Sequence, residues 1–87
     1  MYILLVYDVG EKRVAKYHKY LKRYLNWVQN SVFEGELTES QIESVKAGLE
    51  KIMVTEKDSV IIYTGRESRW LTRQVLGKVR ADIDNLL

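Results

Sequence analysis

Asp8 is the residue whose type and position in this sequence best suit catalysis. It follows Tyr7 at the end of the apolar run formed by residues 3–6, whereas most other acidic residues stand in the polar middle of the chain. Open α/β sheets place their reactive groups at the ends of such strands. A second interpretation stays open, in which Asp8 only caps the next helix or hydrogen-bonds the following loop.

The remaining residue types narrow the chemistry to a carboxylate and a metal ion. The chain has no cysteine, and it lacks a glycine-rich phosphate loop, a dinucleotide-binding motif and a recognisable Ser-His-acid arrangement. Oxygen ligands are those that Mg²⁺ prefers, and a bound Mg²⁺ activates water and neutralises charge on a phosphodiester. A single Asp8 per chain is a poor metal site, so we expect two copies of Asp8 to share the ion across a dimer.

Lysine and arginine residues form two clusters, which flank an acidic middle segment. The first cluster lies within residues 11–25, the acidic segment covers residues 34–58, and the second cluster begins at Arg66. Such a dipolar surface could hold a polyanion along one side, although a solvated helix face explains any single charge run equally well. The cationic residues are Lys12, Arg13, Lys16, Lys19, Lys22, Arg23, Arg66, Arg69, Arg73, Lys78 and Arg80.

Length and composition predict one small domain. A chain of 87 residues, 46% of them hydrophobic, buries only about 60–65% of its unfolded surface, which favours a homodimer. No apolar stretch approaches the roughly 20 residues that cross a bilayer, and the apolar start lacks the features of a signal peptide. We therefore expect a soluble protein that makes no membrane contact, and the absence of cysteine fits a cytoplasmic location.

The first half of the chain predicts a strand, a helix and a hairpin. Residues 3–6 fit a strand buried on both faces, and apolar residues at helical spacing predict an amphipathic helix over 11–24. Residues 26–37 predict two short strands joined tightly at Asn30 and Ser31, or else one long bent strand. The apolar stripe expected on the helix consists of Val14, His18, Leu21 and Leu25.

Two aromatic features of this helix have alternative interpretations. His18 is the only histidine of the chain and lies in the apolar stripe, so we expect it to pack rather than to bind a metal. Tyr17, Tyr20 and Tyr24 could stack on nucleic-acid bases beside the cationic face. Packing in the core or in an interface is the preferred interpretation of these tyrosines.

The second half of the chain predicts a helix and two strands. Thr38 and Gln41 form a capping box, which marks the start of a helix. Residues 59–64 predict a strand, and residues 70–75 predict an edge strand closed by Gly77. The apolar face expected on the helix consists of Ile42, Val45, Leu49, Ile52 and Met53.

This order of elements predicts an α+β, ferredoxin-like β-α-β-β-α-β sandwich with both helices on one face of the sheet. The other face would remain uncovered unless a second sheet meets it, and that contact would bring two copies of Asp8 near a two-fold axis. We therefore expect a homodimer of single domains, residues 1–87. The apolar extension 65–87 is expected to dock on the partner subunit.

Several segments of the sequence resemble the CRISPR-associated protein two family. The resemblance covers nearly all of residues 1–63, and the Gln-Asn-Ser-Val-Phe-Glu-Gly run is its most specific part. The segments are Tyr7-Asp8-Val9, Lys12-Arg13 at the helix start, the run 28–38 (VQNSVFEGELT) and the strand 58–63 (DSVIIY).

The resemblance implies a ferredoxin-like homodimer that works with the CRISPR integrase, protein one of the same system, to insert spacer DNA into the array. It also implies an Mg²⁺-dependent endonuclease on single-stranded RNA or double-stranded DNA, with Asp8 as the metal ligand and catalytic residue. Arg13, Ser31 and Phe33 match family motif positions and are expected to shape the groove or the dimer. Tyr7 belongs to the same motif as Asp8.

Two departures from the family pattern change what is expected. Trp27 stands where many members carry a basic residue, so packing or stacking is expected there in place of a phosphate contact. Beyond Gly65 the match thins, although family members often add a strand from this region to the other subunit's sheet. Residues 70–87 are suited to that role.

Three functions follow as alternatives. Two of them can coexist, namely a nuclease that uses Asp8 and Mg²⁺ and an adaptor that bridges integrase subunits and holds DNA through phosphate contacts. In the alternative form, the protein is only a DNA-binding adaptor, and cleavage is absent or dispensable. The third is a regulatory or RNA-recognition module of the same topology, which is disfavoured because the central strands lack stacking aromatic residues. The residues expected to bind nucleic acid are Arg13, Lys16, Lys19, Arg66 and Arg69.

Overall fold

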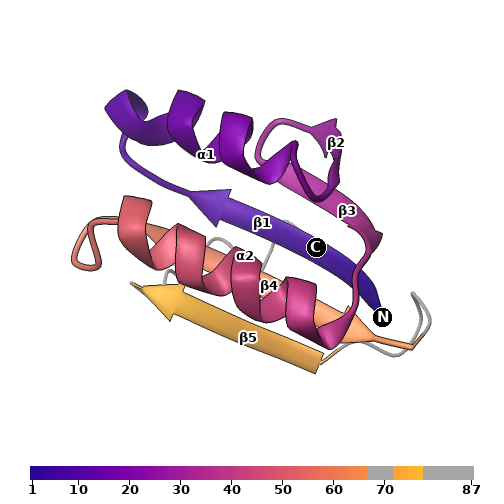
Figure 1. Ribbon diagram of the computed structural model, residues 1–87. Coiled ribbons are helices and arrows are strands. Elements are labelled where there is room, and N and C mark those ends of the chain that lie inside the picture. Colours follow the sequence, from indigo (N-terminus) through magenta and orange to yellow (C-terminus); the bar gives the residue numbers. More distant parts are fainter. Residues whose placement is uncertain (67–71, 78–87) are drawn as a thin grey trace.

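A computed structural model describes residues 1–66 and 72–77, which form one antiparallel sheet with two helices on one face (Figure 1). The strand order is β2-β3-β1-β4-β5, so the predicted α+β, ferredoxin-like fold is confirmed, with one extra strand beside β4. The elements are β1 (Tyr2–Asp8), the 3₁₀ turn η1 (Glu11–Arg13), α1 (Val14–Leu21), β2 (Asn26–Gln29), β3 (Val32–Glu36), α2 (Glu39–Ile52), β4 (Ser59–Gly65) and β5 (Thr72–Gly77).

β1 is the central strand, and its two faces are both apolar. Ile3, Leu5 and Tyr7 point toward the helices and belong to the main core, whereas Val6 points to the other side of the sheet. We call these sides the helix-covered face and the opposite face. The smaller cluster on the opposite face consists of the buried Val6 and Ile61 with Val32, Tyr63 and Val75 packed against them.

The first helix differs from the prediction in its bounds and in its buried side. Its first three residues form a 3₁₀ turn, closed by a hydrogen bond from Arg13 N–H to Gly10 C=O, and α1 ends at Leu21. Val14 is 40% exposed, and Tyr17 takes the buried position instead. Tyr17 tolerates this burial because its hydroxyl has a buried partner, the carboxylate of Asp58.

The hairpin and the second helix follow the sequence pattern. Two short strands flank Asn30, whose φ of 44° lies in the left-handed region that asparagine tolerates. At the start of α2, the Thr38 hydroxyl accepts from Gln41 N–H while the Gln41 side chain accepts from Thr38 N–H, so the capping box is confirmed. Met53 lies just beyond α2 in extended backbone but still packs against the core.

Gly48 allows the two helices to approach each other. The hydroxyl of Tyr20 on α1 lies against Gly48 and donates a 2.9 Å hydrogen bond to the carbonyl of Ser44 on α2. A Cβ atom at position 48 would overlap this hydroxyl. The glycine, which lowers helix propensity, is therefore explained by a close contact between helices.

β5 is an edge strand, as predicted, and it pairs with β4 of its own chain. The described strand begins at Thr72, and residues 70 and 71 of the predicted strand lie outside the described residues. Arg69 and the docking of residues 78–87 also lie outside them. Within residues 1–66 and 72–77, no helix is long and apolar enough to cross a membrane.

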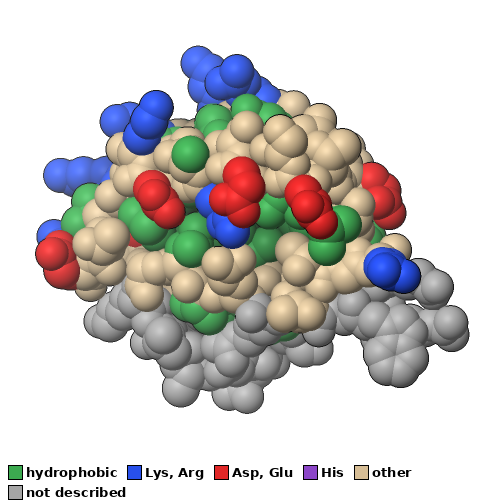
Figure 2. Space-filling view, turned by 60° about the horizontal axis from the view of Figure 1, so that its bottom comes forward, with side chains coloured by type: hydrophobic (Ala, Val, Ile, Leu, Met, Phe, Trp, Pro, Cys, Tyr) green, Lys and Arg blue, Asp and Glu red, His purple; other side chains and the backbone are tan. Residues whose placement is uncertain are grey.

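The described surface shows part of the charge separation that the sequence predicts, since most of the second cationic cluster lies outside the described residues. In Figure 2, cationic side chains gather mainly toward one rim of the molecule, and acidic side chains form a row across the middle of the view.

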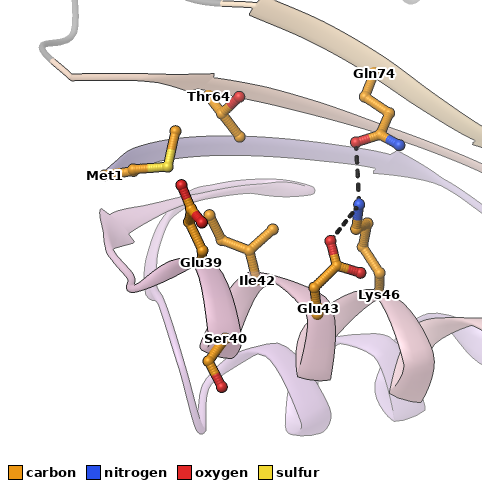
Figure 3. A pocket seen from close by; sticks show the side chains of 8 residues that line it. All are labelled: Met1, Glu39, Ser40, Ile42, Glu43, Lys46, Thr64 and Gln74. Atoms are coloured by element: carbon orange, nitrogen blue, oxygen red, sulfur yellow. Dashed lines mark hydrogen bonds and ion pairs between the residues drawn. The ribbon is translucent and has the colours of Figure 1, made fainter.

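A groove of about 370 Å³ lies between α2 and the strands β4 and β5. Figure 3 shows Lys46 in this groove, where it pairs with Glu43 at 3.1 Å and bonds Gln74 at 3.4 Å.

Candidate functional site

Asp8 is the last residue of β1, at the end of the central strand where the sequence predicts it. It is half-buried, and its cross-strand partner in β4 is Ser59. Since residues directly opposite each other in an antiparallel pair point to the same side, Asp8 and Ser59 share one face of the sheet. Val6 and Ile61 form the next row on that face, so the carboxylate borders the apolar cluster of the opposite face.

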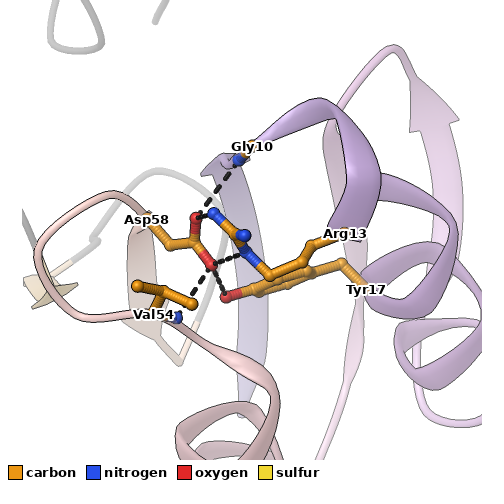
Figure 4. Close-up of polar contacts among 5 residues, drawn as sticks. All are labelled: Gly10, Arg13, Tyr17, Val54 and Asp58. Carbon is orange, nitrogen blue, oxygen red and sulfur yellow. Dashed lines mark hydrogen bonds and ion pairs between the residues drawn. The ribbon is translucent and has the colours of Figure 1, made fainter.

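A second carboxylate, Asp58, lies behind Asp8 on the helix-covered side, and it is fully buried. The guanidinium of Arg13 donates to both of its oxygens, from Nε at 2.7 Å and from Nη2 at 2.5 Å. The Tyr17 hydroxyl donates to it at 2.9 Å. The backbone N–H groups of Gly10 and Val54 donate at 3.2 Å and 3.0 Å (Figure 4). We call these five residues the Asp58 network.

The hydrogen bonds of the network keep Asp58 ionised. Burial would raise the pKa of Asp58, but the Arg13 guanidinium and the surrounding N–H and O–H donors lower that pKa well below its usual range. Burial, reinforced by the hydrogen bond to the Asp58 carboxylate, raises the pKa of Tyr17. The hydrogen bond to Asp58 likewise raises the pKa of Arg13. The network therefore contains a charged pair and a neutral phenol at physiological pH.

The Asp58 network fixes the chain that follows Asp8. Gly10 is only two residues beyond Asp8, and its N–H is bound to a carboxylate that also holds α1 and the turn after α2. A Cβ atom at Gly10 would press on the Arg13 guanidinium, which would have to shift from its present position on Asp58. The network thus fixes the loop after β1 relative to both helices.

The motif residues Tyr7, Ser31 and Phe33 support the end of β1 from the helix-covered face. The buried Tyr7 ring stacks on Tyr17 at 5.3 Å and on Phe33 at 6.2 Å. Tyr7 N–H donates to the Ser31 carbonyl at 3.1 Å. Burial raises the pKa of Tyr7, and a hydrogen bond with the Ser31 side chain opposes that shift. These contacts make the three residues part of the packing behind Asp8.

The cationic residues expected to bind nucleic acid fall into separate places. Lys16 and Lys19 line a groove of about 260 Å³ between the helices, together with Tyr20, Arg23 and Ile52. Arg66 is exposed just after β4, beside the start of β1, because Gly65 pairs with Tyr2. It is therefore at the end of the sheet remote from Asp8.

The sequence places Arg23 in the cationic cluster but not among the residues expected to bind nucleic acid, and it assigns Arg13 to that group. The Arg23 guanidinium lies 5.8 Å from the Tyr20 ring centre and 6.0 Å from that of Tyr24, within cation–π range. It extends the cationic groove of α1 by one further turn. Arg13, in contrast, points to Asp58, and its side chain is only 20% exposed.

Trp27 and His18 pack against each other, as expected for both. Their rings meet edge to face at 5.3 Å, and His18 also contacts Phe33 at 5.2 Å. The Trp27 indole N–H donates to the Asn30 carbonyl at 2.9 Å, which ties the side chain to its own hairpin. Trp27 remains 56% exposed.

One chain supplies only part of a metal site. Among the described residues, no group of three or more His, Cys, Asp or Glu side chains could hold a metal ion. Asp8 and the neighbouring Ser59 hydroxyl are hard oxygen groups, the kind that suits Mg²⁺. The donor chemistry therefore fits a divalent cation in kind, and further ligands would come from water, backbone carbonyls or a second chain.

The comparisons with known proteins agree with this arrangement. Residues 1–73 match the family of CRISPR associated protein Cas2. A "CRISPR-associated endoribonuclease Cas2" of Methanothermobacter thermautotrophicus is 51% identical over 100% of this chain and 96% of its own length. A protein of the same name from Pyrococcus furiosus is 49% identical over the full length of both chains.

Solved structures show the same fold. A crystal structure described as Cas2 superposes with a TM-score of 0.74 at 44% identity, covering 93% of this chain and 91% of the other. Streptococcus pyogenes Cas2 at pH 6.5 gives a TM-score of 0.71 at 31% identity, covering 78% and 89%. The fold, the motif residues around Asp8 and these similarities together identify the chain as a member of the CRISPR-associated Cas2 family.

Proposed function

We propose that this protein is a metal-dependent endonuclease in which Asp8 binds a divalent cation, Mg²⁺, and that it acts as a homodimer. The observation that carries the proposal is the position of Asp8 at the end of the central strand, in a chain closely similar to proteins named endoribonucleases. The half-buried carboxylate borders apolar side chains, so it would hold a cation in a site of reduced water content.

The chain's own residues would orient the reaction. When bound, Mg²⁺ would supply an activated water and neutralise charge on the phosphodiester. Asp8 would hold the ion on the opposite face of the sheet, while stacked Tyr7 supports the strand from behind. The Asp58 network would keep the loop after Asp8 in one conformation, so that little reorganisation accompanies substrate binding.

Dimerisation would complete the site. The opposite face carries the apolar cluster of Val6 and Ile61, and Asp8 lies on the same face of the sheet. A second copy that meets this face would bring its own Asp8 close, so two carboxylates would share one ion. The contact that forms the homodimer would therefore also bring the two Asp8 carboxylates together.

The same dimer would serve in CRISPR adaptation as the partner of the integrase that inserts spacer DNA, in the cytoplasm. The groove lined by Lys16, Lys19 and Arg23 supports this role, since phosphate contacts of this kind bind DNA without reading its sequence. Arg66 and Arg69 complete the proposed nucleic-acid contacts, whereas Arg13 is engaged by the buried Asp58 carboxylate and would contribute by fixing the loop after β1. In the alternative form of this proposal, the protein is a DNA-binding adaptor whose cleavage activity is absent or dispensable.

The proposed activity is tested with Asp8→Asn, which keeps the size of the side chain and removes its charge. Cleavage of single-stranded RNA and of double-stranded DNA is measured with Mg²⁺ and with EDTA. We expect the wild-type protein to cleave at least one substrate only with Mg²⁺, and the variant to lose that activity while it still dimerises and binds DNA. Cleavage by the pure variant at the wild-type rate would contradict the role of Asp8.

A spacer-insertion assay with the integrase separates the two forms of the proposal. If insertion requires Asp8, the nuclease site contributes to adaptation. If Asp8→Asn supports insertion at the wild-type level, the protein acts there as an adaptor.

A further inference from the structure

Ser59 has a buried hydroxyl that its surroundings do not explain. It is the first residue of β4 and is fully buried. In the part of the chain that the structure describes, its Oγ is the one buried side-chain oxygen or nitrogen without a hydrogen-bond partner. A buried polar atom of this kind destabilises a fold, and in a native protein it calls for an explanation such as strain, a catalytic role, or a bound water or ion. Alanine would fill the same space without this penalty.

The sheet places this hydroxyl beside Asp8. Ser59 and Asp8 are directly opposite each other in the β1–β4 pair, where Cβ atoms are typically about 5 Å apart. A serine hydroxyl and an aspartate carboxylate can reach hydrogen-bond distance across such a pair. On the other side of Ser59, the partner in β5 is Gly77, which has no side chain. In this row of three strands, the Asp8 carboxylate is therefore the only side-chain acceptor.

Asp58 and Ser59 point to opposite sides of the sheet, so their side chains have different neighbours. Asp58 binds Arg13 and Tyr17 on the helix-covered side. Ser59 shares the opposite face with Asp8 and with the apolar Val6 and Ile61. The Asp58 network therefore offers no partner to the Ser59 hydroxyl, and the apolar cluster offers none either.

We propose that Ser59 is a positioning residue, whose hydroxyl donates a hydrogen bond to the Asp8 carboxylate when Asp8 binds the divalent cation. This inference rests on the proposed metal site. Carboxylates that bind a metal through one oxygen commonly accept a hydrogen bond on the other, and that bond fixes the ligand's orientation. Loss of such a bond typically weakens metal binding by about 10- to 100-fold. Apolar neighbours strengthen the bond by excluding water.

The test compares Ser59→Ala with the wild-type protein, using Mn²⁺ as the probe ion. We expect the dissociation constant for Mn²⁺, measured by calorimetry, to rise about 10-fold or more. The Mg²⁺ concentration for half-maximal cleavage should rise by the same factor, while the rate at saturating Mg²⁺ changes less. The melting temperature should stay the same or rise, because the variant removes an unsatisfied hydroxyl. Ser59→Thr keeps the hydroxyl and should keep most of the affinity.

Two further variants separate the possible outcomes. Ser44→Ala, on the exposed side of α2, is the control and should leave Mn²⁺ binding unchanged. In an Asp8→Asn background, Ser59→Ala should have no additional effect on metal binding. Wild-type Mn²⁺ affinity in Ser59→Ala, with binding abolished by Asp8→Asn, would overturn this inference alone. Unchanged binding in Asp8→Asn itself would overturn the proposed metal site as well.

Discussion

The Arg13 guanidinium donates two hydrogen bonds to the buried carboxylate of Asp58, from Nε and from Nη2, although the two residues are 45 positions apart in the sequence. The pair is enclosed, since Asp58 is fully buried and the Arg13 side chain is 20% exposed. Its energetic importance follows from this burial, because a buried charge that loses its partner is strongly destabilising. The pair also sets the conformation of the loop after Asp8, through the bond from Gly10.

The first prediction concerns stability at low pH. Because the pKa of Asp58 is lower in the folded protein than its unfolded value of 3.8, its contribution to stability is present above about pH 4 and is lost as the pH falls further. We expect the melting temperature to fall between pH 5 and pH 2, as measured by circular dichroism. Asp58→Asn should be less stable by about 3 kcal/mol at pH 7 and should show a weaker pH dependence.

The exposed Glu56 provides the control for this experiment. Glu56→Gln should melt like the wild-type protein at every pH. If Asp58→Asn retains the full acid sensitivity of the wild type, other carboxylates are responsible and the Asp58 network is not the acid-labile element.

The second prediction distinguishes Arg13, whose charge stabilises the fold, from Lys16 and Lys19, whose charges are proposed to bind nucleic acid. Arg13→Gln should lower the melting temperature, because it leaves the buried Asp58 carboxylate without its charged partner. Charge reversal of Lys16 and Lys19 should leave the melting temperature nearly unchanged, because both side chains are exposed on α1. The double reversal should weaken binding to duplex DNA and reduce the salt dependence, by about 0.9 in log–log slope for each phosphate that the variant no longer neutralises.

Fluorescence anisotropy at several salt concentrations measures this effect. Lys51→Glu, which makes the same charge change on exposed α2, serves as the matched control. Should the Lys16 and Lys19 variant bind with wild-type affinity and slope, α1 is not part of the footprint, and Arg66 and Arg69 become the residues to test.

The third prediction concerns the contact between the helices. Replacing glycine by alanine within a helix usually stabilises it by about 1 kcal/mol. Gly48→Ala should give no such gain here, because the new Cβ displaces the Tyr20 hydroxyl and breaks its bond to Ser44. In a Tyr20→Ala background the same substitution should recover the gain. Urea denaturation of the four proteins in this cycle provides the numbers, and equal effects in both backgrounds would contradict the contact.

Local sequence patterns predict the helices, strands and turns of this fold. They do not predict which polar residues are buried, because burial of these residues depends on hydrogen-bond partners far away in the sequence. The capping box at Thr38 and the turn at Asn30 are short-range signals, and both are confirmed. The expected core position of Val14 was wrong, because the helix starts with a 3₁₀ turn and Val14 is exposed. The packing expected for Tyr17 is confirmed, but its hydrogen-bond partner lies 41 residues away and was not predicted.

Asp58, at the candidate site, is another residue whose burial the sequence did not predict. Its place in the acidic segment suggested a solvated residue, yet it is fully buried. The available signal was its position directly before the apolar strand β4, which mirrors the position of Asp8 directly after the apolar run of β1. What the sequence could not reveal is that the donors to Asp58 come from the loop after β1, α1 and the turn after α2.

The number of metal ions bound per chain tests the central claim most directly. If two Asp8 carboxylates share one cation across a dimer, titration with Mn²⁺ should saturate at one ion for every two chains, with sedimentation confirming the dimer in the same sample. Asp8→Asn should remain dimeric and bind no ion at that site. Saturation at one ion for each chain, or the same saturation in Asp8→Asn, would contradict the shared site.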